Sequence, residues 1–235
     1  MSVTDFHTHI LPCIDDGSKS VQDSANMLQN QAEQGIKRVV AVPHFYANHD
    51  NPQRFLENRE KSKKMLGDLL CESLELPEIK VGAEIYFFEG ISDCEFLRKM
   101  AIEDTNCVMI EMPMKHWSER NLAELVGIYQ KQNLTPIIAH VDRYVKLFTA
   151  RKTFAMLSKL PVKIQVNATF FIRPMTRRLA LSLLKQGKIH LIGSDCHNID
   201  IRPPNVAQAL EIIRNSLGER AISYLEQNEK FIFEQ

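Results

Sequence analysis

The stretch VTDFHTHILPCIDDGSKS, residues 3–20, places two histidines at alternate positions near the start of the chain and then a pair of aspartates. Taken alone, it predicts a strand, a turn and a helix cap, because Asp15 and Asp16 before a glycine are typical of turns and Ser20 is typical of a cap. Histidines at alternate positions can also turn two imidazoles toward one place. The rest of the chain decides between these interpretations.

Short apolar, β-branched segments alternate with segments of helical periodicity along the chain. The candidate strands are residues 3–6, 37–42, 79–84, 106–111, 135–139, 162–167 and 189–194, and the candidate helices are 20–34, 118–131, 174–186 and 204–217. Such alternation is typical of parallel strands joined by right-handed crossovers. It predicts an α/β fold, a distorted seven-stranded β/α barrel that forms one domain over residues 1–235. An open, doubly wound sheet is the alternative.

Polar side chains follow the candidate strands at the point where each strand ends. They are His7, His9, His44, Glu84, Glu111, His140, Asn167, Asp195 and His197. The carboxyl ends of barrel strands meet on one face, so we expect these side chains to converge. Buried carboxylates are costly unless a cation compensates them, and imidazole with carboxylate suits Mn, Zn or Fe. Because the donors exceed the needs of one ion, the sequence predicts two or three divalent ions.

Composition excludes other classes of protein. Hydrophobic residues make up 44% of the 235 residues, and 29 basic residues balance 29 acidic ones. A net charge of zero argues against a general nucleic-acid or membrane-surface binder. The five cysteines form no CxxC pair, and neither a signal peptide nor a run of ~20 apolar residues is visible. We therefore expect a soluble, cytoplasmic protein without stable membrane insertion, whose oligomeric state the sequence leaves open.

The motifs together resemble the PHP superfamily, which is named for polymerase and histidinol phosphatase domains. The HxH pair, DDGSKS, PH, GAEI, IEMP, HVDRY and SDCHN extend from residue 5 to about residue 204. More narrowly, they resemble the metal-dependent bacterial tyrosine-protein phosphatases that are encoded with capsular or extracellular polysaccharide genes. This resemblance implies a PHP-type barrel with a trinuclear metal centre, in which manganese is the usual ion and Fe, Zn or Mg are alternatives.

The resemblance also implies the role of each matching residue. The metal ligands would be His7, His9, Asp16, His44, Glu84, Glu111, His140, Asp195 and His197. Asp16 is preferred to Asp15 because the second aspartate of the matching motif is the ligand, which leaves Asp15 a structural residue. Two arginines near the metals would match Arg143 and Arg202 and act in catalysis.

The activity implied is hydrolysis of phosphotyrosine in a bacterial tyrosine kinase that controls capsule or exopolysaccharide synthesis. A metal-activated hydroxide would attack phosphorus while the arginines neutralise the phosphoryl oxygens. Asp142 and Asp200 are candidates for a general acid, but neither is assigned. Phe45 and Tyr46 are candidates for stacking on a substrate ring, although packing is the simpler explanation. Departures from the family pattern at Cys13, after His140 and after His44 leave every predicted ligand in place.

Three rival functions are considered. A PHP-type phosphatase could instead act on a small molecule such as histidinol phosphate or a nucleotide. A cysteine-dependent phosphatase would need the spacing that Cys196 and Arg202 happen to show, but the intervening loop has no glycine to let backbone N–H groups surround a phosphate. A barrel without activity could serve as a partner of a kinase.

Overall fold

The computed structural model describes residues 3–70, 76–146 and 150–234. All the paired strands in these ranges run parallel, in one sheet of order β1-β2-β4 and another of order β3-β5-β6-β7-β8-β9. The strands are β1 (Thr4–Thr8), β2 (Arg38–Ala41), β3 (His44–Phe45), β4 (Glu78–Val81), β5 (Glu84–Tyr86), β6 (Cys107–Glu111), β7 (Thr135–Ile138), β8 (Lys163–Asn167) and β9 (Leu191–Gly193). Cys71 lies outside the described residues.

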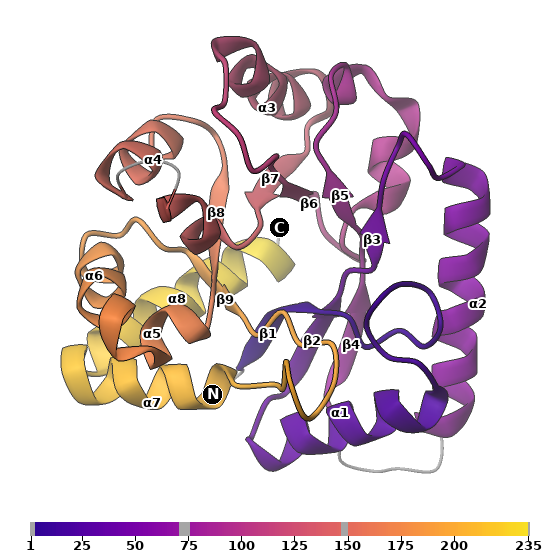
Figure 1. Ribbon diagram of the computed structural model, residues 1–235, viewed down its shortest axis with the longest axis horizontal. Helices are drawn as coiled ribbons and strands as arrows, with labels where there is room; N and C mark the ends of the chain where they lie inside the picture. The colour runs from indigo at the N-terminus through magenta and orange to yellow at the C-terminus, as the bar shows by residue number, and fades with distance from the viewer. Residues whose placement is uncertain (1–2, 71–75, 147–149, 235) are drawn as a thin grey trace.

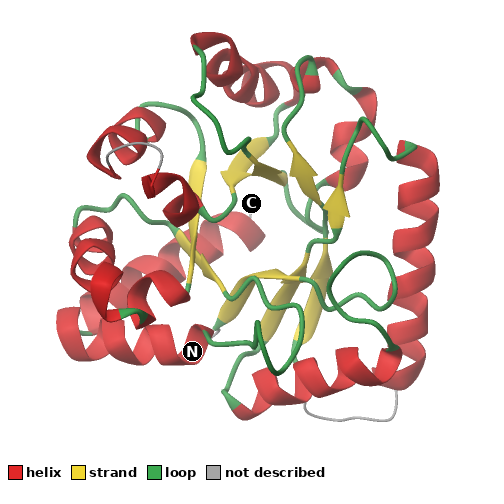
Figure 2. Ribbon diagram, in the orientation of Figure 1, coloured by secondary structure: helices red, strands yellow, loops and turns green. Residues whose placement is uncertain are grey.

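Helices surround the strands on the outside (Figures 1 and 2). They are α1 (Val21–Glu33), α2 (Pro52–Leu70), α3 (Glu119–Gln132), α4 (Ala150–Leu157), α5 (Thr169–Ile172), α6 (Pro174–Lys185), α7 (Val206–Leu217) and α8 (Glu219–Phe233), with 3-10 turns at η1 (Ile91–Asp93), η2 (Glu95–Met100) and η3 (Val141–Lys146). The capping signals act as the sequence predicts. Ser20 accepts a hydrogen bond from Asp23 N at the start of α1, and Ser118 and Asn121 form a reciprocal capping box on α3.

Two of the predicted strands are each accompanied by a second, short strand in the structure. The segment predicted over 37–42 contains β2, and a further short strand, β3, follows it after Pro43; the segment predicted over 79–84 contains β4 and the first residue of β5. Proline has no N–H to donate to a sheet, so a strand is interrupted there. Gly82 N nevertheless donates to Ala41 O at 2.9 Å, which keeps the two broken strands together. The predicted count of seven strands is therefore not confirmed.

The parallel sheet is curled rather than flat. At its free edge, β1 approaches the segment that follows β9: Asp195 N donates to His7 O at 2.8 Å, and His9 N donates to Cys196 O at 2.9 Å. An isolated parallel bridge also joins Thr8 to Cys196. The strands surround a common centre (Figure 2), so the open, doubly wound alternative does not describe this chain.

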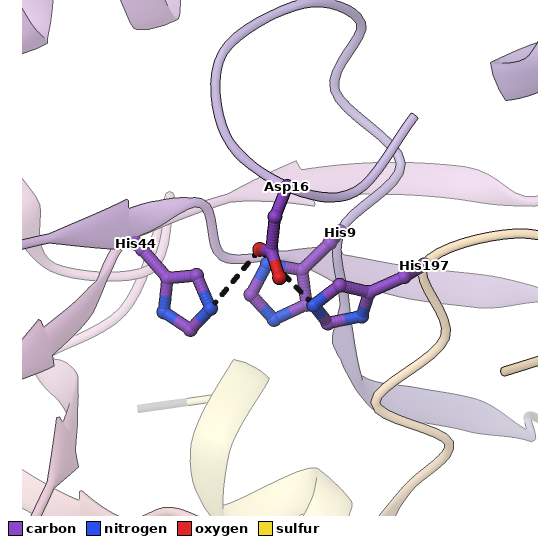
Figure 3. Close-up of side chains that lie close together, drawn as sticks. All are labelled: His9, Asp16, His44 and His197. Atoms are coloured by element: carbon purple, nitrogen blue, oxygen red, sulfur yellow. Dashed lines mark ion pairs between the residues drawn. The ribbon is translucent and has the colours of Figure 1, made fainter. Parts of the chain in front are cut away.

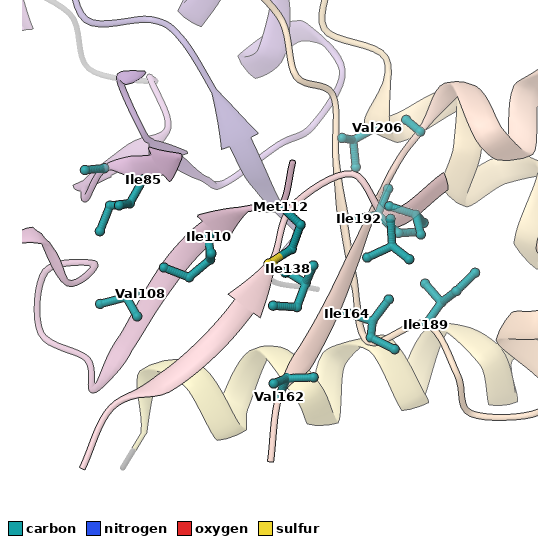
Figure 4. Packing of buried hydrophobic residues seen from close by; sticks show 14 of the residues in the cluster. Ile85, Val108, Ile110, Met112, Ile138, Val162, Ile164, Ile189, Ile192 and Val206 are labelled. Atoms are coloured by element: carbon teal, nitrogen blue, oxygen red, sulfur yellow. The ribbon is translucent and has the colours of Figure 1, made fainter. Parts of the chain in front are cut away.

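Alternation along the strands separates two hydrophobic clusters. Val108 and Ile110 of β6 belong to the outer cluster, which packs between sheet and helices (Figure 4). Cys107 and Met109 belong to the inner cluster, which fills the space that the sheet encloses. Successive side chains of a strand face opposite sides, so Glu111 continues the inner row to the carboxyl end of the strand. This geometry turns the strand-end side chains toward one another.

The last helix closes the opposite end of the curled sheet, at the amino ends of the strands. Ile232 of α8 is fully buried in the inner cluster, and the rings of Phe233 and Phe6 stack with centroids 5.7 Å apart. Figure 1 shows α8 crossing behind the strands. Across the described residues, every helix is too short or too polar to cross a lipid bilayer.

Candidate metal centre

Glu84 is the central carboxylate of a cluster at the carboxyl ends of the strands. Its Oε2 lies 3.2 Å from His7 Nε2, 3.4 Å from His9 Nε2 and 3.0 Å from His44 Nδ1. Its Oε1 lies 2.7 Å from His140 Nε2. The Glu84 side chain has no solvent exposure, and the surrounding imidazoles hold its pKa well below the usual range, although burial alone would raise it. One carboxylate thus contacts four of the predicted ligands.

Asp195 is the second buried carboxylate of the cluster. Its Oδ1 lies 3.7 Å from His7 Nε2 and 3.5 Å from His9 Nε2. Arg202 donates to the same oxygen at 2.7 Å, Arg143 donates to Oδ2, and Asn167 Nδ2 donates to Oδ2 at 3.0 Å. The polar residue at the end of β8, Asn167, is therefore a donor to a candidate ligand.

Asp16 reaches the cluster from the loop between β1 and α1, beside His9, His44 and His197 (Figure 3). Its Oδ1 lies 3.4 Å from His44 Nε2 and 3.3 Å from His197 Nε2. The Asp16 side chain is 64% exposed, whereas His197 is buried. Asp16 therefore marks the solvent side of the cluster.

The donor atoms form three sets, each compact enough to hold one metal ion. The sets are His9, Asp16, His44 and His197; His7, His9 and Asp195; and His44, Glu84 and Glu111, with all donor atoms of a set within 4.8 Å of one another. His9 and His44 each belong to two sets. His140 contacts Glu84 and, at 3.5 Å, Glu111. All nine side chains predicted as ligands are thus brought together.

Poorly satisfied polar atoms show that this donor set suits cations. Among the described residues, His140 Nδ1 is buried without a hydrogen-bond partner. Glu84 Oε2 and His44 Nδ1 lie 3.0 Å apart and His197 Nε2 lies 3.3 Å from Asp16 Oδ1, but these three buried atoms make no well-aligned hydrogen bond. Each such atom costs about 1–3 kcal/mol when it stays unsatisfied. A divalent ion compensates atoms of this kind, because imidazole nitrogen and carboxylate oxygen are ligands for Mn, Zn and Fe. The residues present therefore fit a polynuclear metal site.

Asp15 orients the cluster instead of merely shaping a turn. Its Oδ2 accepts hydrogen bonds from His9 Nδ1 at 2.7 Å and from His44 N at 3.1 Å, and its Oδ1 accepts one from Gly17 N at 2.9 Å. Burial would raise the pKa of Asp15, but the hydrogen bond from His9 lowers it to about 2. The proton of His9 is thereby kept on Nδ1, which leaves Nε2 to face Glu84 and Asp195.

Gln165 is a supporting residue that the sequence analysis missed. Its Oε1 accepts a hydrogen bond from His140 N at 2.6 Å and lies 3.4 Å from His7 Nδ1. Gln165 is fully buried in the middle of β8. The only signal in the sequence is a glutamine inside an apolar strand, which does not by itself indicate which imidazole it contacts.

Two candidate ligands have unusual backbone conformations. His140 has a φ of 32° and Asp195 a φ of 57°, both in the left-handed region that residues with a Cβ rarely adopt. Such strain persists where the surrounding structure fixes it, and it concentrates at functional sites. At His140 and Asp195 the backbone leaves the extended conformation of the preceding strand, and both side chains contact the cluster.

Arg143 and Arg202, the two arginines expected near the metals, lie at the open side of the cluster. Their side chains are 36% and 37% exposed, so each guanidinium contacts Asp195 and also faces solvent. Asp142, the neighbouring candidate acid, is partly buried and accepts a hydrogen bond from Asn167 N at 2.8 Å. Burial raises the pKa of Asp142 to about 6. Its contacts are those of a residue that holds the start of η3 in place.

Cys196 does not have the surroundings of a nucleophile. It is fully buried next to Asp195, and burial raises the pKa of its thiol far above the usual value. Reactive cysteines need a lowered pKa and access to substrate. The structure therefore gives no support to a cysteine-dependent phosphatase.

Fold and site together define a class: curled, parallel α/β proteins that carry a candidate polynuclear metal centre at the carboxyl ends of their strands. The chain belongs to the capsular polysaccharide synthesis family CpsB/CapC, whose family model matches residues 3–233. This membership confirms the resemblance that the motifs indicate.

Named relatives and solved structures are similar over nearly the whole chain. The tyrosine-protein phosphatase CpsB of Streptococcus pneumoniae is 28% identical, over 98% of each chain. The tyrosine-protein phosphatase YwqE of Bacillus subtilis is 25% identical, over 97% of this chain and 90% of the other. A crystal structure from work on YwqE and CpsB, described as metal-dependent tyrosine phosphatases, superposes with a TM-score of 0.86 at 22% identity, over 99% of this chain and 94% of that one. Histidinol phosphate phosphatase from Lactococcus lactis, bound to zinc, L-histidinol and phosphate, gives a TM-score of 0.59 at 13% identity, with 94% of each chain covered.

Proposed function

We propose that this protein is a metal-dependent protein-tyrosine phosphatase, a phosphoric monoester hydrolase. One observation carries the proposal: nine imidazole and carboxylate side chains converge, eight of them in three compact donor sets and His140 through its contacts with Glu84 and Glu111, and two arginines face the same opening from solvent. Family membership and the names of the relatives support it. Residues 1–235 are proposed to form a single domain, a barrel with seven strand positions. In this barrel β2 and β3 count as one interrupted strand, and β4 and β5 count as another.

The candidate ligands would hold two or three divalent ions, manganese first and Fe, Zn or Mg as alternatives. They are His7, His9, Asp16, His44, Glu84, Glu111, His140, Asp195 and His197. When bound, such ions supply a Lewis acid that polarises phosphoryl oxygens and makes water acidic enough to act near neutral pH. Glu84, which contacts four imidazoles, would hold the ions together with these histidines.

The chain's own residues bind and orient the phosphate ester. Arg143 and Arg202 carry planar guanidinium groups, which can donate two hydrogen bonds each to phosphoryl oxygens. Both contact Asp195 in this structure, so they are already positioned at the donor cluster.

The substrate is proposed to be phosphotyrosine in a bacterial tyrosine kinase that controls capsule or exopolysaccharide synthesis, in the cytoplasm. A tyrosine leaving group has a pKa near 10, so it departs with less protonation than an alkoxide would need. This suits a site in which the Asp142 carboxylate is partly buried and already accepts a hydrogen bond from the backbone. The alternative is a small-molecule phosphatase, which the structural likeness to histidinol phosphate phosphatase keeps open.

Hydrolysis of a phosphotyrosine peptide by metal-depleted and manganese-loaded protein tests the proposal. We expect activity only in the loaded protein, and a large loss in Arg202→Ala without loss of metal. His44→Ala is expected to lose metal as well as activity. Faster turnover of histidinol phosphate than of the peptide would instead favour the alternative. Cys196→Ser is the control, and loss of turnover in this variant with metal retained would contradict the metal-dependent reaction.

A further inference from the structure

Two segments with the same pattern lie side by side at the candidate metal centre. His44–Tyr46 and Glu84–Tyr86 each place one apolar residue between a candidate ligand and a tyrosine. β3 and β5 pair in parallel, with His44 opposite Glu84. Each tyrosine therefore comes two residues after its ligand, and the two tyrosines follow neighbouring segments of the chain. The proposed reaction gives neither tyrosine a role.

Alternation along the strands turns both tyrosines toward the opening. Residues two apart on a strand share a face, so Tyr86 lies on the side of Glu84. Tyr46 follows directly after β3, and its ring contact with His44 places it on the side of His44. The residues between them are fully buried in the outer cluster, whereas both tyrosines are only partly buried. The ring of Tyr46 has its centroid 5.5 Å from that of His44 and 5.7 Å from that of Tyr86. Tyr46 and Tyr86 thus form an aromatic wall next to the ligands.

The aromatic wall continues into a cavity of about 350 Å³. Tyr86 lines this cavity together with Phe88, Met114 and Lys115, from the segments that follow β5 and β6. Tyr86 is also opposite Glu111 in the pairing of these strands, so the cavity begins beside a candidate ligand. Met114 is 54% exposed there. A path therefore leads from the ligands, along two aromatic rings, into a partly apolar cavity.

We propose that Tyr46 and Tyr86 are specificity-determining residues, which bind the aromatic ring of an aryl phosphate ester while the cavity receives the peptide chain beside that ring. The inference rests on the proposed function and deepens it. In an aryl ester the ring begins one bridging oxygen away from phosphorus, so a phosphate at the donor cluster brings the ring to the aromatic wall. Aromatic pairs attract in offset-stacked and edge-to-face arrangements, and an alkyl ester has no ring to offer.

Phenylphosphonate and methylphosphonate test the aromatic wall, because they share the phosphonate group and differ in the ring. Calorimetric titration of manganese-loaded protein is expected to give three- to tenfold tighter binding of phenylphosphonate, about the contribution of one or two aromatic contacts. Tyr46→Leu and Tyr86→Leu keep an apolar side chain without a ring, so the ratio of the affinities for phenylphosphonate and methylphosphonate should fall toward one. Tyr46→Phe should retain it. Tyr129→Leu, which changes a tyrosine of α3 that is 46% exposed, is the matched control.

Equal binding of the two phosphonates by the wild-type protein, or an unchanged preference in Tyr46→Leu and Tyr86→Leu, would overturn the assignment. Manganese content is matched between variants before titration. Since the titration involves no turnover, it is independent of the proposed activity. A protein that prefers phenylphosphonate yet leaves a phosphotyrosine peptide intact would refute the phosphatase proposal and keep the aromatic wall.

Met114→Asp tests the role of the cavity. The substitution places a charge at an apolar part of its lining, so binding of a peptide that carries phosphonomethyl-phenylalanine should weaken several-fold. Binding of phenylphosphonate, which has no peptide chain, should remain as in the wild type. Equal effects on the two ligands, or no effect on the peptide, would overturn the assignment of the cavity to the peptide chain.

Discussion

Asp15 and Asp16 are neighbours in the sequence with different surroundings in the fold. The Asp15 side chain is 5% exposed and holds His9 and the backbone of His44, whereas Asp16 is 64% exposed and contacts His44 and His197 through its own oxygen. A carboxylate that orients an imidazole contributes to metal affinity without touching the metal. The two residues should therefore differ in how their loss affects the protein.

Asp15→Ala is expected to weaken manganese affinity by about 10–100-fold, the usual effect of removing a group that orients a ligand. The loss arises because His9 Nδ1 and the two N–H groups bonded to Asp15 lose their acceptor. Calorimetric titration with Mn²⁺ measures it. Asp23→Ala, on the first turn of α1, is the control, and an affinity equal to the wild-type value in Asp15→Ala would contradict the orienting role.

Gly193→Ala should destabilise the protein, because a Cβ at this position would lie 2.4 Å from His7 Cβ and 2.8 Å from His7 N. Overpacking of this kind costs about 1–3 kcal/mol. Gly67→Ala, in α2 with no atom within 4 Å of its added Cβ, is the matched control and should stabilise by about 0.5–1 kcal/mol. Urea unfolding measures both, and equal effects would show that Gly193 is not constrained by His7.

Residue types at strand ends could be predicted from the sequence, but their supporting contacts could not. The candidate ligands stand out because each polar side chain follows a buried apolar run, a pattern that any reader of the chain can see. The choice of Asp16 over Asp15 came from the resemblance to a family. The roles of Asp15 and Gln165 depend on which backbone N–H groups the fold brings to them, and no local pattern contains that information.

At the scale of elements, β8 and β9 are joined by a side chain as well as by their backbones. His190, just before β9, accepts a hydrogen bond from Ile164 N at Nδ1, at 3.0 Å, and His190 N donates to Ile164 O at 3.0 Å. Burial, with a smaller effect of Lys163, lowers the pKa of His190 to about 4. The strand contact thus requires a neutral imidazole.

His190 is expected to make stability fall in acid. Its folded-state pKa lies below the ordinary value of 6.5, so the unfolded chain binds the proton first and the contribution is lost as pH drops from about 6.5 toward 4. The loss reaches at most about 3 kcal/mol. His190→Asn keeps an acceptor for Ile164 N without titrating. Urea unfolding between these pH values should show a shallower pH dependence in the variant, and parallel curves would contradict the prediction.

The positions of the elements were predictable, whereas their interruptions were not. Periodicity and caps placed α1, α3 and α6 within one or two residues of their observed bounds. The break between β2 and β3 comes from Pro43, yet a proline near a strand end is equally compatible with a strand that simply stops. Whether the chain resumes pairing after a proline depends on the neighbouring strand, which here is β5.

At the scale of the whole molecule, the two ends of the parallel strands differ: one carries the candidate metal ligands, and the other is covered by a helix. The carboxyl ends of the strands carry the candidate ligands, and the amino ends are closed by α8, a helix that the sequence analysis did not predict. The sequence predicts no helix beyond residue 217. α8 covers the inner cluster, and that cluster forms only when the sheet curls, so its position depends on the tertiary structure and not on local sequence.

Ile232→Ala is expected to destabilise the protein by about 2–5 kcal/mol, the usual effect of truncating a buried isoleucine, while manganese affinity stays at the wild-type value. Ile201→Ala is the matched control, because Ile201 is 86% exposed and such changes stay within about 0.5 kcal/mol. Chemical denaturation and metal titration of both variants provide the measurements. A loss of metal affinity in Ile232→Ala would show that the two ends of the molecule are coupled.

The position of α8 also decides how the protein can be held on a solid support. Its last described turns pack at the amino ends of the strands, where Glu229 contacts Thr4 and Arg38, whereas the candidate ligands lie at the carboxyl ends. A sensor chip or bead attached through the C-terminus would therefore leave the opening directed at the solution. A large phosphorylated protein could then reach Arg143 and Arg202 as freely as a short peptide does.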